Sequence, residues 1–357
     1  MRVQSHSLSR KGKSMKKLAI AAALAALTTA VSAQNVQVYG IIDTGFQSHD
    51  NGTDSYSRAF DSGVATSRLG FRGSEDLGGG LKANFQLEAQ LNPSSGSVGS
   101  TTVAANETFN REAWVGLSSN TLGEIRIGRQ DVTYAQDVDA GTSQFGNFGN
   151  RAINGTAIEL GSDQKNVIKY ITPKLGGFYA QVGFGSANNA GATSDTAGDQ
   201  QGALVGYDDG RLKLFVGTHK VDATAAAGDR DFNVLGAAYN LGYAQVGVTY
   251  AEGDVNNANG AKNKSTQGSV RVPLGRGFAA HAVYAVAEDG AQATEGKGTG
   301  YTLGVSKELS KRTSLYAAYT SVDNEANARM YMAGQVAAPA TAGLDTKTYT
   351  VGLVHAF

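Results

Sequence analysis

The sequence predicts an all-β fold: a transmembrane antiparallel β-barrel of 16 strands with a long third loop folded into the lumen. Three features of the 357-residue chain indicate this fold. Apolar and polar residues alternate along many short segments, and short and long connections alternate between those segments. One connection, residues 128–163, is very long, has no regular period and is rich in Gly, Asn and Asp. An insert of this length in a compact chain is usually functional or disordered, so we expect it to narrow the barrel.

Residues 81–91 show the alternation most clearly. Leu81, Phe85 and Leu87 fall on one face of an extended segment, while Lys82 and Glu88 fall on the other. Successive strand side chains point to opposite faces, so one face is apolar and the other is polar. The same pattern recurs in residues 178–184, 211–219, 245–250 and 301–306.

The connections distinguish a barrel from a soluble sheet, which also alternates when one face is wet. The short connections are expected at Leu77–Gly80, Asn120–Gly123, Lys174–Gly177, Asp208–Gly210, Asn240–Tyr243, Leu274–Gly277 and Leu309–Arg312. Longer polar stretches lie at Asn92–Glu107, Ser186–Gln200, Val221–Arg230, Gly253–Lys264, Glu288–Gly298 and Asp323–Asp345. Such alternation of turns and loops is typical of outer-membrane barrels. A barrel of about sixteen strands leaves an aqueous channel, which predicts a diffusion channel.

Aromatic residues near the strand ends suggest girdles at the two membrane interfaces. Ordinary strand preference explains many of them equally well. The group is Tyr170, Phe178, Phe184, Tyr243, Tyr250, Phe278, Tyr284, Tyr301, Tyr316 and Tyr319.

The first 33 residues have the pattern of a secretory signal peptide. Lys16 and Lys17 precede an apolar run, and small residues at Val31 and Ala33 predict cleavage after Ala33. The run is too short for a membrane-spanning helix. We therefore expect residues 34–357 to form a single barrel domain, with Met15 as a second candidate start.

The charge and composition of the expected mature chain exclude several classes of function. Residues 1–33 hold six basic and no acidic residues, so 25 basic and 31 acidic residues remain, a net charge of −6. This balance argues against a nucleic-acid partner, which requires surplus Lys and Arg. The chain has no Cys and hence no thiolate metal site. We expect neither a metal nor a cofactor.

Several segments resemble the general porins of Gram-negative bacteria, particularly the β-proteobacterial porins of the Neisseria and Burkholderia type. They are VQVYGIIDTG, SRLGFRGSEDLGGGLKANFQLE, REAWVGL, GEIRIGRQ and NVIKYITPKLGGFYAQVGF, with TYTVGLVHAF at the end of the chain. The resemblance covers essentially the whole mature chain. It implies a homotrimeric barrel in the outer membrane, which contacts lipid and passes ions and small hydrophilic solutes.

The resemblance also implies a constriction with basic residues on the wall. Arg68 and Arg111 are similar to the first two wall arginines of the family, and Lys169 stands where the family often has a third. Lysine keeps the charge of that position but not its bidentate geometry. Arg72 and Arg126 share the inward parity of their strands and extend the group.

Strand parity gives different expectations for two of these basic residues. Lys169 is expected inside, because Ile168 and Tyr170 flank it on the opposite face. Arg111 has the parity of Val115, whereas Trp114 is expected to face lipid.

Acidic residues of the long loop are the expected partners of the basic wall. The nearest to the loop tip are Asp137 and Asp139, and the other candidates are Asp131, Glu159 and Asp163. The segment FGNFGNR resembles the PEFGG-type loop segment of the family but lacks its Pro-Glu. Three wall cations against two loop acids predict a mild preference for anions.

The C-terminus is similar to the assembly signal of the family. Phe357 ends the chain, and Leu353, Val351 and Tyr349 share one face before it. This resemblance implies recognition by the outer-membrane insertion machinery.

Three alternatives remain open. An enzyme would need a nucleophile and a base within hydrogen-bond reach, and none of the four histidines of the mature chain has a serine two residues away on the same strand face. A substrate-selective channel for small carboxylates or phosphate would use the same basic wall. A structural or adhesive protein would require a smaller barrel or a passenger domain.

Overall fold

A computed structural model of the chain describes residues 36–99, 107–133, 143–149, 153–154, 164–187, 198–222, 228–254, 262–289, 296–332, 339 and 341–357. The expected signal peptide lies outside the described residues. Within the described ranges, no helix has the length and apolar character needed to cross a membrane.

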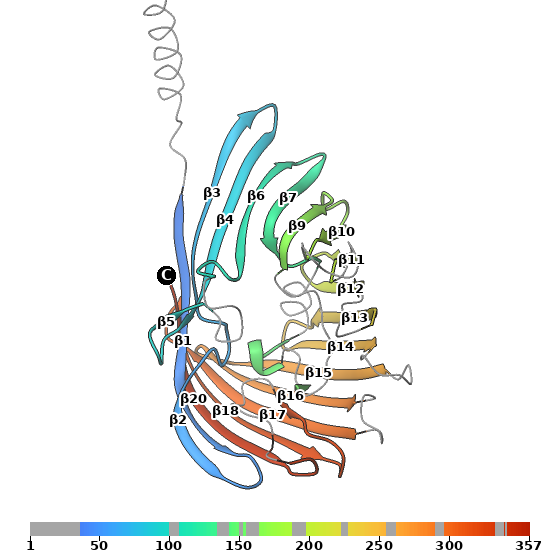
Figure 1. Cartoon of the computed structure of the whole chain (residues 1–357). Helices are drawn as coiled ribbons and strands as arrows, with labels where there is room; N and C mark the ends of the chain where they lie inside the picture. The colour runs from blue at the N-terminus through green and yellow to red at the C-terminus, as the bar shows by residue number, and fades with distance from the viewer. Residues whose placement is uncertain are drawn as a thin grey trace, which may run out of the picture.

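Long antiparallel strands form one closed barrel around a wide lumen (Figure 1). They are β1 (Gln37–Asp50), β2 (Ser55–Asp61), β3 (Arg68–Gly78), β4 (Leu81–Asn92), β6 (Glu112–Ser119), β7 (Gly123–Gln130), β9 (Gln164–Ile171), β10 (Phe178–Gly185), β11 (Gln200–Asp208), β12 (Leu212–Val221), β13 (Arg230–Asn240), β14 (Gln245–Asp254), β15 (Lys262–Gly275), β16 (Phe278–Asp289), β17 (Gly296–Glu308), β18 (Thr313–Asn324) and β20 (Thr346–Ala356). The connections contain β5 (Ser97–Val98), β8 (Ile153–Asn154), β19 (Tyr331–Met332) and the 3-10 helix η1 (Gly146–Gly149).

The ring closes where the first strand meets the last. One edge of β1 pairs with β20, from Ile41 opposite Ala356 to Asp50 opposite Lys347. The other edge pairs with β3 in its first half and with β2 in its second half. Because β2 and β3 together fill one position of the ring, the described strands form a sixteen-stranded barrel. The predicted fold is confirmed.

The two faces of the wall differ as the alternation predicts. Outward side chains such as Val115, Val182 and Leu303 are exposed, whereas inward residues such as Gln181 and Thr302 are buried. Outward apolar side chains suit contact with lipid, and inward polar groups suit water and the loops. The seven short connections fall at one end of the barrel, and the long ones fall at the other.

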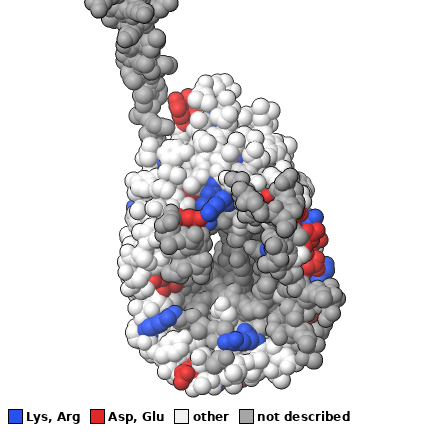
Figure 2. Space-filling view, viewed as in Figure 1, with Lys and Arg blue, Asp and Glu red and all other residues white. Residues whose placement is uncertain are grey.

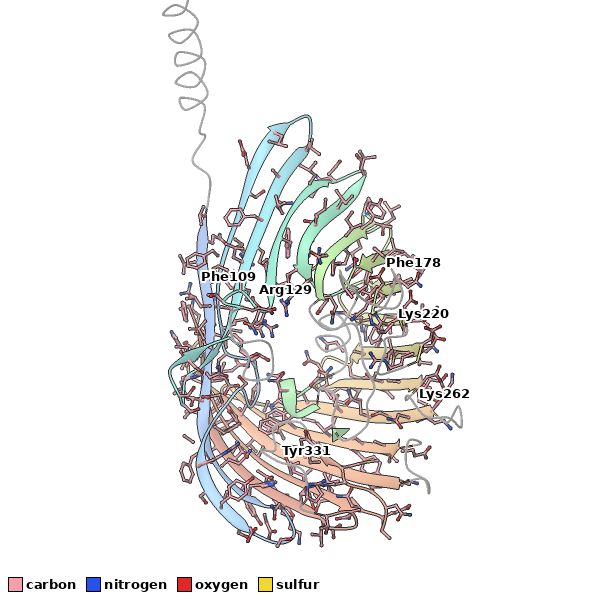
Figure 3. The ribbon with its side chains drawn as sticks, in the orientation of Figure 1. Phe109, Arg129, Phe178, Lys220, Lys262 and Tyr331 are labelled. Carbon is pink, nitrogen blue, oxygen red and sulfur yellow. The ribbon has the colours of Figure 1, made fainter. Side chains whose placement is uncertain are left out.

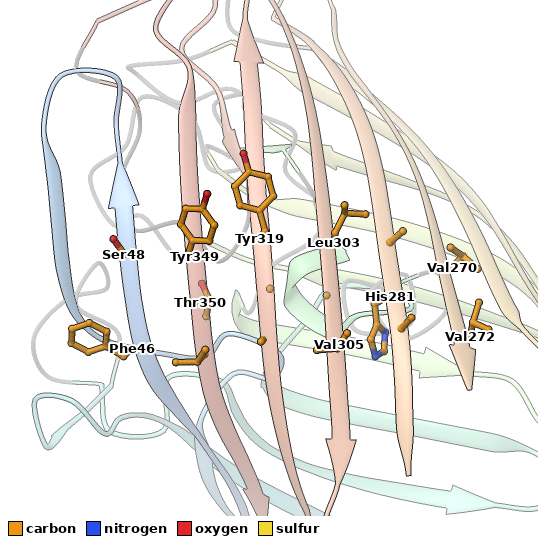
Figure 4. A pocket seen from close by; sticks show the side chains of 16 residues that line it. Phe46, Ser48, Val270, Val272, His281, Leu303, Val305, Tyr319, Tyr349 and Thr350 are labelled. Atoms are coloured by element: carbon orange, nitrogen blue, oxygen red, sulfur yellow. The ribbon is translucent and has the colours of Figure 1, made fainter. Parts of the chain in front are cut away.

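Several of the tyrosines expected in the aromatic girdles lie on the outer face of the barrel, among them Tyr170, Tyr243 and Tyr284. Tyr301 lies 5.9 Å from Tyr319 between ring centroids, and Tyr319 lies 4.9 Å from Tyr349. Figure 4 shows Tyr319 and Tyr349 side by side with their hydroxyls toward the same end of the barrel. The expectation is wrong for Tyr316, which is 4 % exposed and lies inside. Its strand-end position does not reveal which face it occupies.

The third loop enters the lumen, as predicted. After β7, Val132 and Thr133 lie fully buried against Gly183 of β10 and Gly202 of β11. Farther along the loop, η1 lies inside the ring of strands beside β15 (Figure 1).

Two phenylalanines fix the inner part of this loop to the opposite wall. The ring of Phe145 stacks on His281 of β16 at 4.1 Å, and Phe148 packs edge-on against Tyr316 of β18 at 5.9 Å. The main chain of the loop is also attached to the wall, because Gln144 N–H donates to Ser269 Oγ of β15 at 3.1 Å. The loop therefore bridges the lumen between β10–β11 and β15–β18.

Candidate functional site

The inner wall formed by β3, β4, β6, β7 and β9 carries four of the predicted basic residues. We call Arg68, Arg111, Arg126 and Lys169 the basic wall cluster. In the order of the ring these strands lie opposite β15–β18, where η1 is anchored. The basic wall cluster and η1 thus belong to different parts of the ring, while the third loop itself starts from β7 beside the cluster.

Two members of the cluster share one carboxylate, Glu88 of β4. Arg111 Nε lies 2.6 Å from Glu88 Oε1, and Arg68 Nη1 lies 3.6 Å from the same oxygen. The other oxygen, Oε2, accepts a hydrogen bond from the Tyr39 hydroxyl at 2.8 Å. Hydrogen bonds between ionised groups are stronger than neutral ones, so Glu88 fixes three side chains from separate elements.

Gly70 makes the Tyr39 bond possible. Tyr39 on β1 reaches Glu88 on β4 by crossing β3 at Gly70, which lies opposite both residues in the ladders. A Cβ atom at Gly70 would overlap the Tyr39 ring. Glycine is therefore required for close approach at this position.

The other two members of the cluster are neighbours across strands. Arg126 of β7 lies directly opposite Lys169 of β9 in the ladder. The Arg126 guanidinium sits 4.2 Å from the Trp114 ring centroid and 2.8 Å from Glu124 Oε2. A cation over an aromatic face is attracted by the ring quadrupole, so Trp114 and Glu124 hold Arg126 against the wall.

A second wall carboxylate, Glu112 of β6, links the two halves of the cluster. Glu112 lies directly opposite Glu88 in the ladder. It interacts electrostatically with Asp131, Lys169 and Arg126. Asp131 stands where the third loop leaves β7 and is 5 % exposed. Glu88, Glu112 and Glu124 are thus described carboxylates that interact with the basic wall cluster, and Asp131 interacts with Glu112.

The structure places the predicted residues unevenly. Lys169 is 6 % exposed on the inner face, while Ile168 faces outward, as parity predicts. The expected lipid-facing position of Trp114 is wrong, because Trp114 is buried and Val115 is exposed. Arg111 precedes β6, so strand parity does not apply to it.

The remaining predicted residues lie apart from the cluster or outside the described part. Arg72 is exposed, its Nε donates to Gln37 Oε1 at 3.1 Å, and its guanidinium covers Tyr39 at 4.9 Å. Asp137 and Asp139 lie outside the described residues, as do Glu159 and Asp163.

Glu88 and Glu112 belong to this candidate site and were missed by the sequence analysis. Glu88 was placed on the polar face of its segment, but nothing in that pattern identifies a partner. The partners of Glu88 are known only once the strand register is known, because Glu88 lies opposite Gly70 on one side and Glu112 on the other.

Comparisons with known proteins agree with this geometry. The sequence profile described as Gram-negative porin matches residues 19–327. The chain belongs to the Gram-negative porin family. Outer membrane porin protein 32 of Delftia acidovorans is 34% identical to it over 360 residues, covering 96% of this chain and 100% of the relative. An outer membrane porin protein of Bordetella pertussis is 31% identical and covers 85% and 93%.

A solved structure supports the same conclusion. The anion-selective porin from Comamonas acidovorans is 33% identical, with a TM-score of 0.77, and covers 91% of this chain and 100% of its own. Family membership makes this protein an outer-membrane general diffusion porin, a channel for ions and small hydrophilic solutes. A diffusion channel therefore replaces the alternative of a structural or adhesive protein.

Figure 2 shows Lys and Arg side chains of the porin gathered at the edge of the opening, with Asp and Glu beside them. Arg129, at the end of β7, lies at this edge (Figure 3). Arg129 Nη1 is 3.1 Å from Glu107 Oε2, and Lys165 forms an ion pair with Glu107 Oε1. Glu107 thus joins the second loop to β7 and β9.

The hydrogen bond from Lys165, followed by the charge of Arg129, lowers the pKa of the Glu107 carboxyl. A carboxyl with a lowered folded-state pKa stabilises the fold above its unfolded pKa and loses that contribution as pH falls. We therefore expect the unfolding temperature of the porin to decrease when the pH is lowered past about 4.5. Thermal unfolding in detergent between pH 7 and 3 measures this. Glu107→Gln should flatten part of that slope, and an identical slope in the variant would contradict the assignment.

The C-terminus of the porin closes the ring at the turn end. Phe357 N–H donates to the Gly40 carbonyl at 3.1 Å, and Gly40 N–H donates to the Phe357 carbonyl at 3.2 Å. Phe357 is 42% exposed. Tyr349, Val351 and Leu353 are exposed on the same outer face, so the whole predicted signal lies on one side of β20.

Proposed function

We propose that this porin prefers anions mildly and that the passage between the basic wall cluster and the third loop sets this preference. One observation carries the proposal: the shared carboxylate is hidden behind its arginines. The side chains of Arg68 and Arg111 are 23% and 16% exposed, whereas that of Glu88 is 4% exposed. The positive groups are therefore the ones presented to water in the lumen.

The physical basis is the field of fixed charges in a narrow pore. Charged side chains that line a constriction attract ions of the opposite sign and repel ions of the same sign. Glu88 reduces the field of Arg68 and Arg111 but does not cancel it at the water-facing atoms, because it lies farther from the passing ion. The relative from Comamonas acidovorans, described as anion-selective, supports the same sign.

The direct test is the reversal potential of refolded porin in a planar bilayer under a KCl gradient. We expect a modest anion preference. A cation preference would mean that the carboxylates of the passage outweigh the basic wall cluster, and it would overturn the proposal.

Glu88→Gln removes the hidden negative charge and should increase the anion preference about threefold. A unit charge about 6 Å from an ion in water changes its energy by roughly 0.7 kcal/mol, and salt screening about halves that value. The change acts in opposite directions on K⁺ and Cl⁻. Glu252→Gln is the matched control, because Glu252 pairs with Lys262 at 3.1 Å on the outer face of β14. Equal permeability ratios of Cl⁻ to K⁺ in the two variants would exclude Glu88 from the passage.

The same proposal includes assembly and export. We propose a homotrimer, a signal peptide at residues 1–33 and recognition of the C-terminal strand by the insertion machinery. Family membership supports all three, and the single exposed face that holds Tyr349, Val351, Leu353 and Phe357 supports the last. Conductance steps grouped in threes in the KCl experiment would identify the trimer.

A further inference from the structure

The first loop turns into the lumen at residues 62–67, between β2 and β3, and one buried carboxylate holds this inward turn. Asp43 of β1 is 0 % exposed. Its Oδ2 accepts hydrogen bonds from Val64 N–H at 2.6 Å and from Ala65 N–H at 2.7 Å. Its main chain exchanges two further bonds with the Ser67 hydroxyl, at 2.9 and 3.0 Å.

The other side of the inward turn carries the third loop. Asn147 of η1 donates its main-chain N–H to the Val64 carbonyl at 2.8 Å. Its side-chain amide donates to the Ser62 carbonyl, also at 2.8 Å. Gly146 packs against Val64 so closely that a Cβ atom would overlap the Val64 carbonyl. The position of η1 therefore depends on the position of the turn.

Asp43 reaches the third loop by a second route. Its Oδ1 accepts a hydrogen bond from the Tyr316 hydroxyl at 2.7 Å. The Tyr316 ring packs against Phe148, which stacks on Phe145 at 5.1 Å. One carboxylate thus fixes a main-chain support and an aromatic support of the same loop.

The inward turn also reaches the basic wall. Arg68 directly follows the turn, and its Nε donates to the Thr66 carbonyl at 2.9 Å. The short segment from Ser62 to Arg68 therefore contacts η1 through Ser62 and Val64 and orients a member of the basic wall cluster through Thr66.

We infer that Asp43 is a positioning residue that sets the width and steadiness of the passage by fixing the inward turn between the third loop and Arg68. This inference rests on the proposed constriction but not on its ion preference. Hydrogen bonds to a buried charged acceptor contribute more than neutral ones, and an unpaired buried donor is strongly unfavourable. Without the carboxylate, the two N–H groups of the turn and the Tyr316 hydroxyl lose their common acceptor.

The test is single-channel recording of refolded Asp43→Asn in symmetric KCl. The asparagine oxygen cannot accept all the bonds of the carboxylate, so we expect time spent in reduced-conductance substates to rise at least about tenfold. Asp50→Asn is the matched control: Asp50 lies on the same strand and also accepts a main-chain N–H, from Gly52 at 2.8 Å. That bond belongs to the outer turn at 51–54, so the control should behave as the wild type.

Two milder variants keep the test valid if Asp43→Asn does not fold. Asn147→Ala removes one neutral hydrogen bond and should raise substate occupancy about fivefold. Tyr316→Phe keeps the contact with Phe148 and removes only the bond to Asp43, so it should raise occupancy by a similar factor. Neither changes the charge of the lumen, which separates loop support from a field effect.

A double variant separates a positioning role from a general loss of stability. If Asp43 acts through the turn on η1, adding Asn147→Ala to Asp43→Asn should change substate occupancy little beyond Asp43→Asn alone. Full additivity of the two effects would overturn the inference, as would wild-type traces in all three single variants. Because occupancy is measured without an ion gradient, a porin with a different ion preference would still give a clear result.

Discussion

Arg68→Glu is expected to shift the permeability ratio toward cations about tenfold. The substitution changes the charge beside the passage by two units, and each unit acts oppositely on Cl⁻ and K⁺ at the screened energies expected about 6 Å from an ion. The new carboxylate would also stand beside Glu88, which now lies 3.6 Å from Arg68. The reversal potential under a KCl gradient measures the change.

Three variants define how this result is interpreted. Arg68→Lys keeps the charge and should stay near the wild-type ratio, and Arg68→Gln should give about half the logarithmic shift. Lys347→Glu makes the same two-unit change on β20, where Lys347 is exposed on the outer face, and should leave the ratio unchanged. An unaltered reversal potential in Arg68→Glu would remove Arg68 from the constriction.

Gly183→Ala is expected to lower single-channel conductance by roughly a third, because the start of the third loop must move into the lumen to make room. A Cβ atom at Gly183 would overlap the main-chain oxygen of Val132. A backbone atom cannot rotate away as a side chain can, so the loop itself must be displaced. Overpacking of this kind also lowers stability by about 1–3 kcal/mol, which thermal unfolding would detect.

The same strand offers a matched control. Gly185 shares the inner face of β10 with Gly183, but its added Cβ would first meet Val167 Cγ2 at 3.2 Å. Gly185→Ala should therefore leave conductance close to the wild-type value. Equal conductance in the two variants would show that Val132 does not press on the wall.

The sequence predicted the wall well because strand patterns are local. Leu81 and Lys82 reveal opposite faces without reference to any other strand, and each tight turn between strands is specified by a few consecutive residues. The long irregular segment at 128–163 also correctly indicated the inward loop. These features depend on neighbours in sequence, which the printed chain already provides.

The site was predicted less completely because its contacts join distant residues. Tyr39, Glu88 and Arg111 meet only after three strands have taken their register. Trp114 was misplaced because a large aromatic residue suits both a lipid interface and a cation in the lumen. Tyr316 was assigned to a girdle for a similar reason, while its partner Asp43 lies 273 residues away.

The closure of the ring by its two termini also restricts how the protein can fold. Gln47 of β1 donates a side-chain hydrogen bond to Thr350 of β20, 303 residues later. Until the C-terminal strand has paired with it, β1 keeps an unpaired edge, and such edges readily join other chains. Contacts of this sequence separation also form slowly. The barrel therefore cannot close until its C-terminal strand is available to pair with β1.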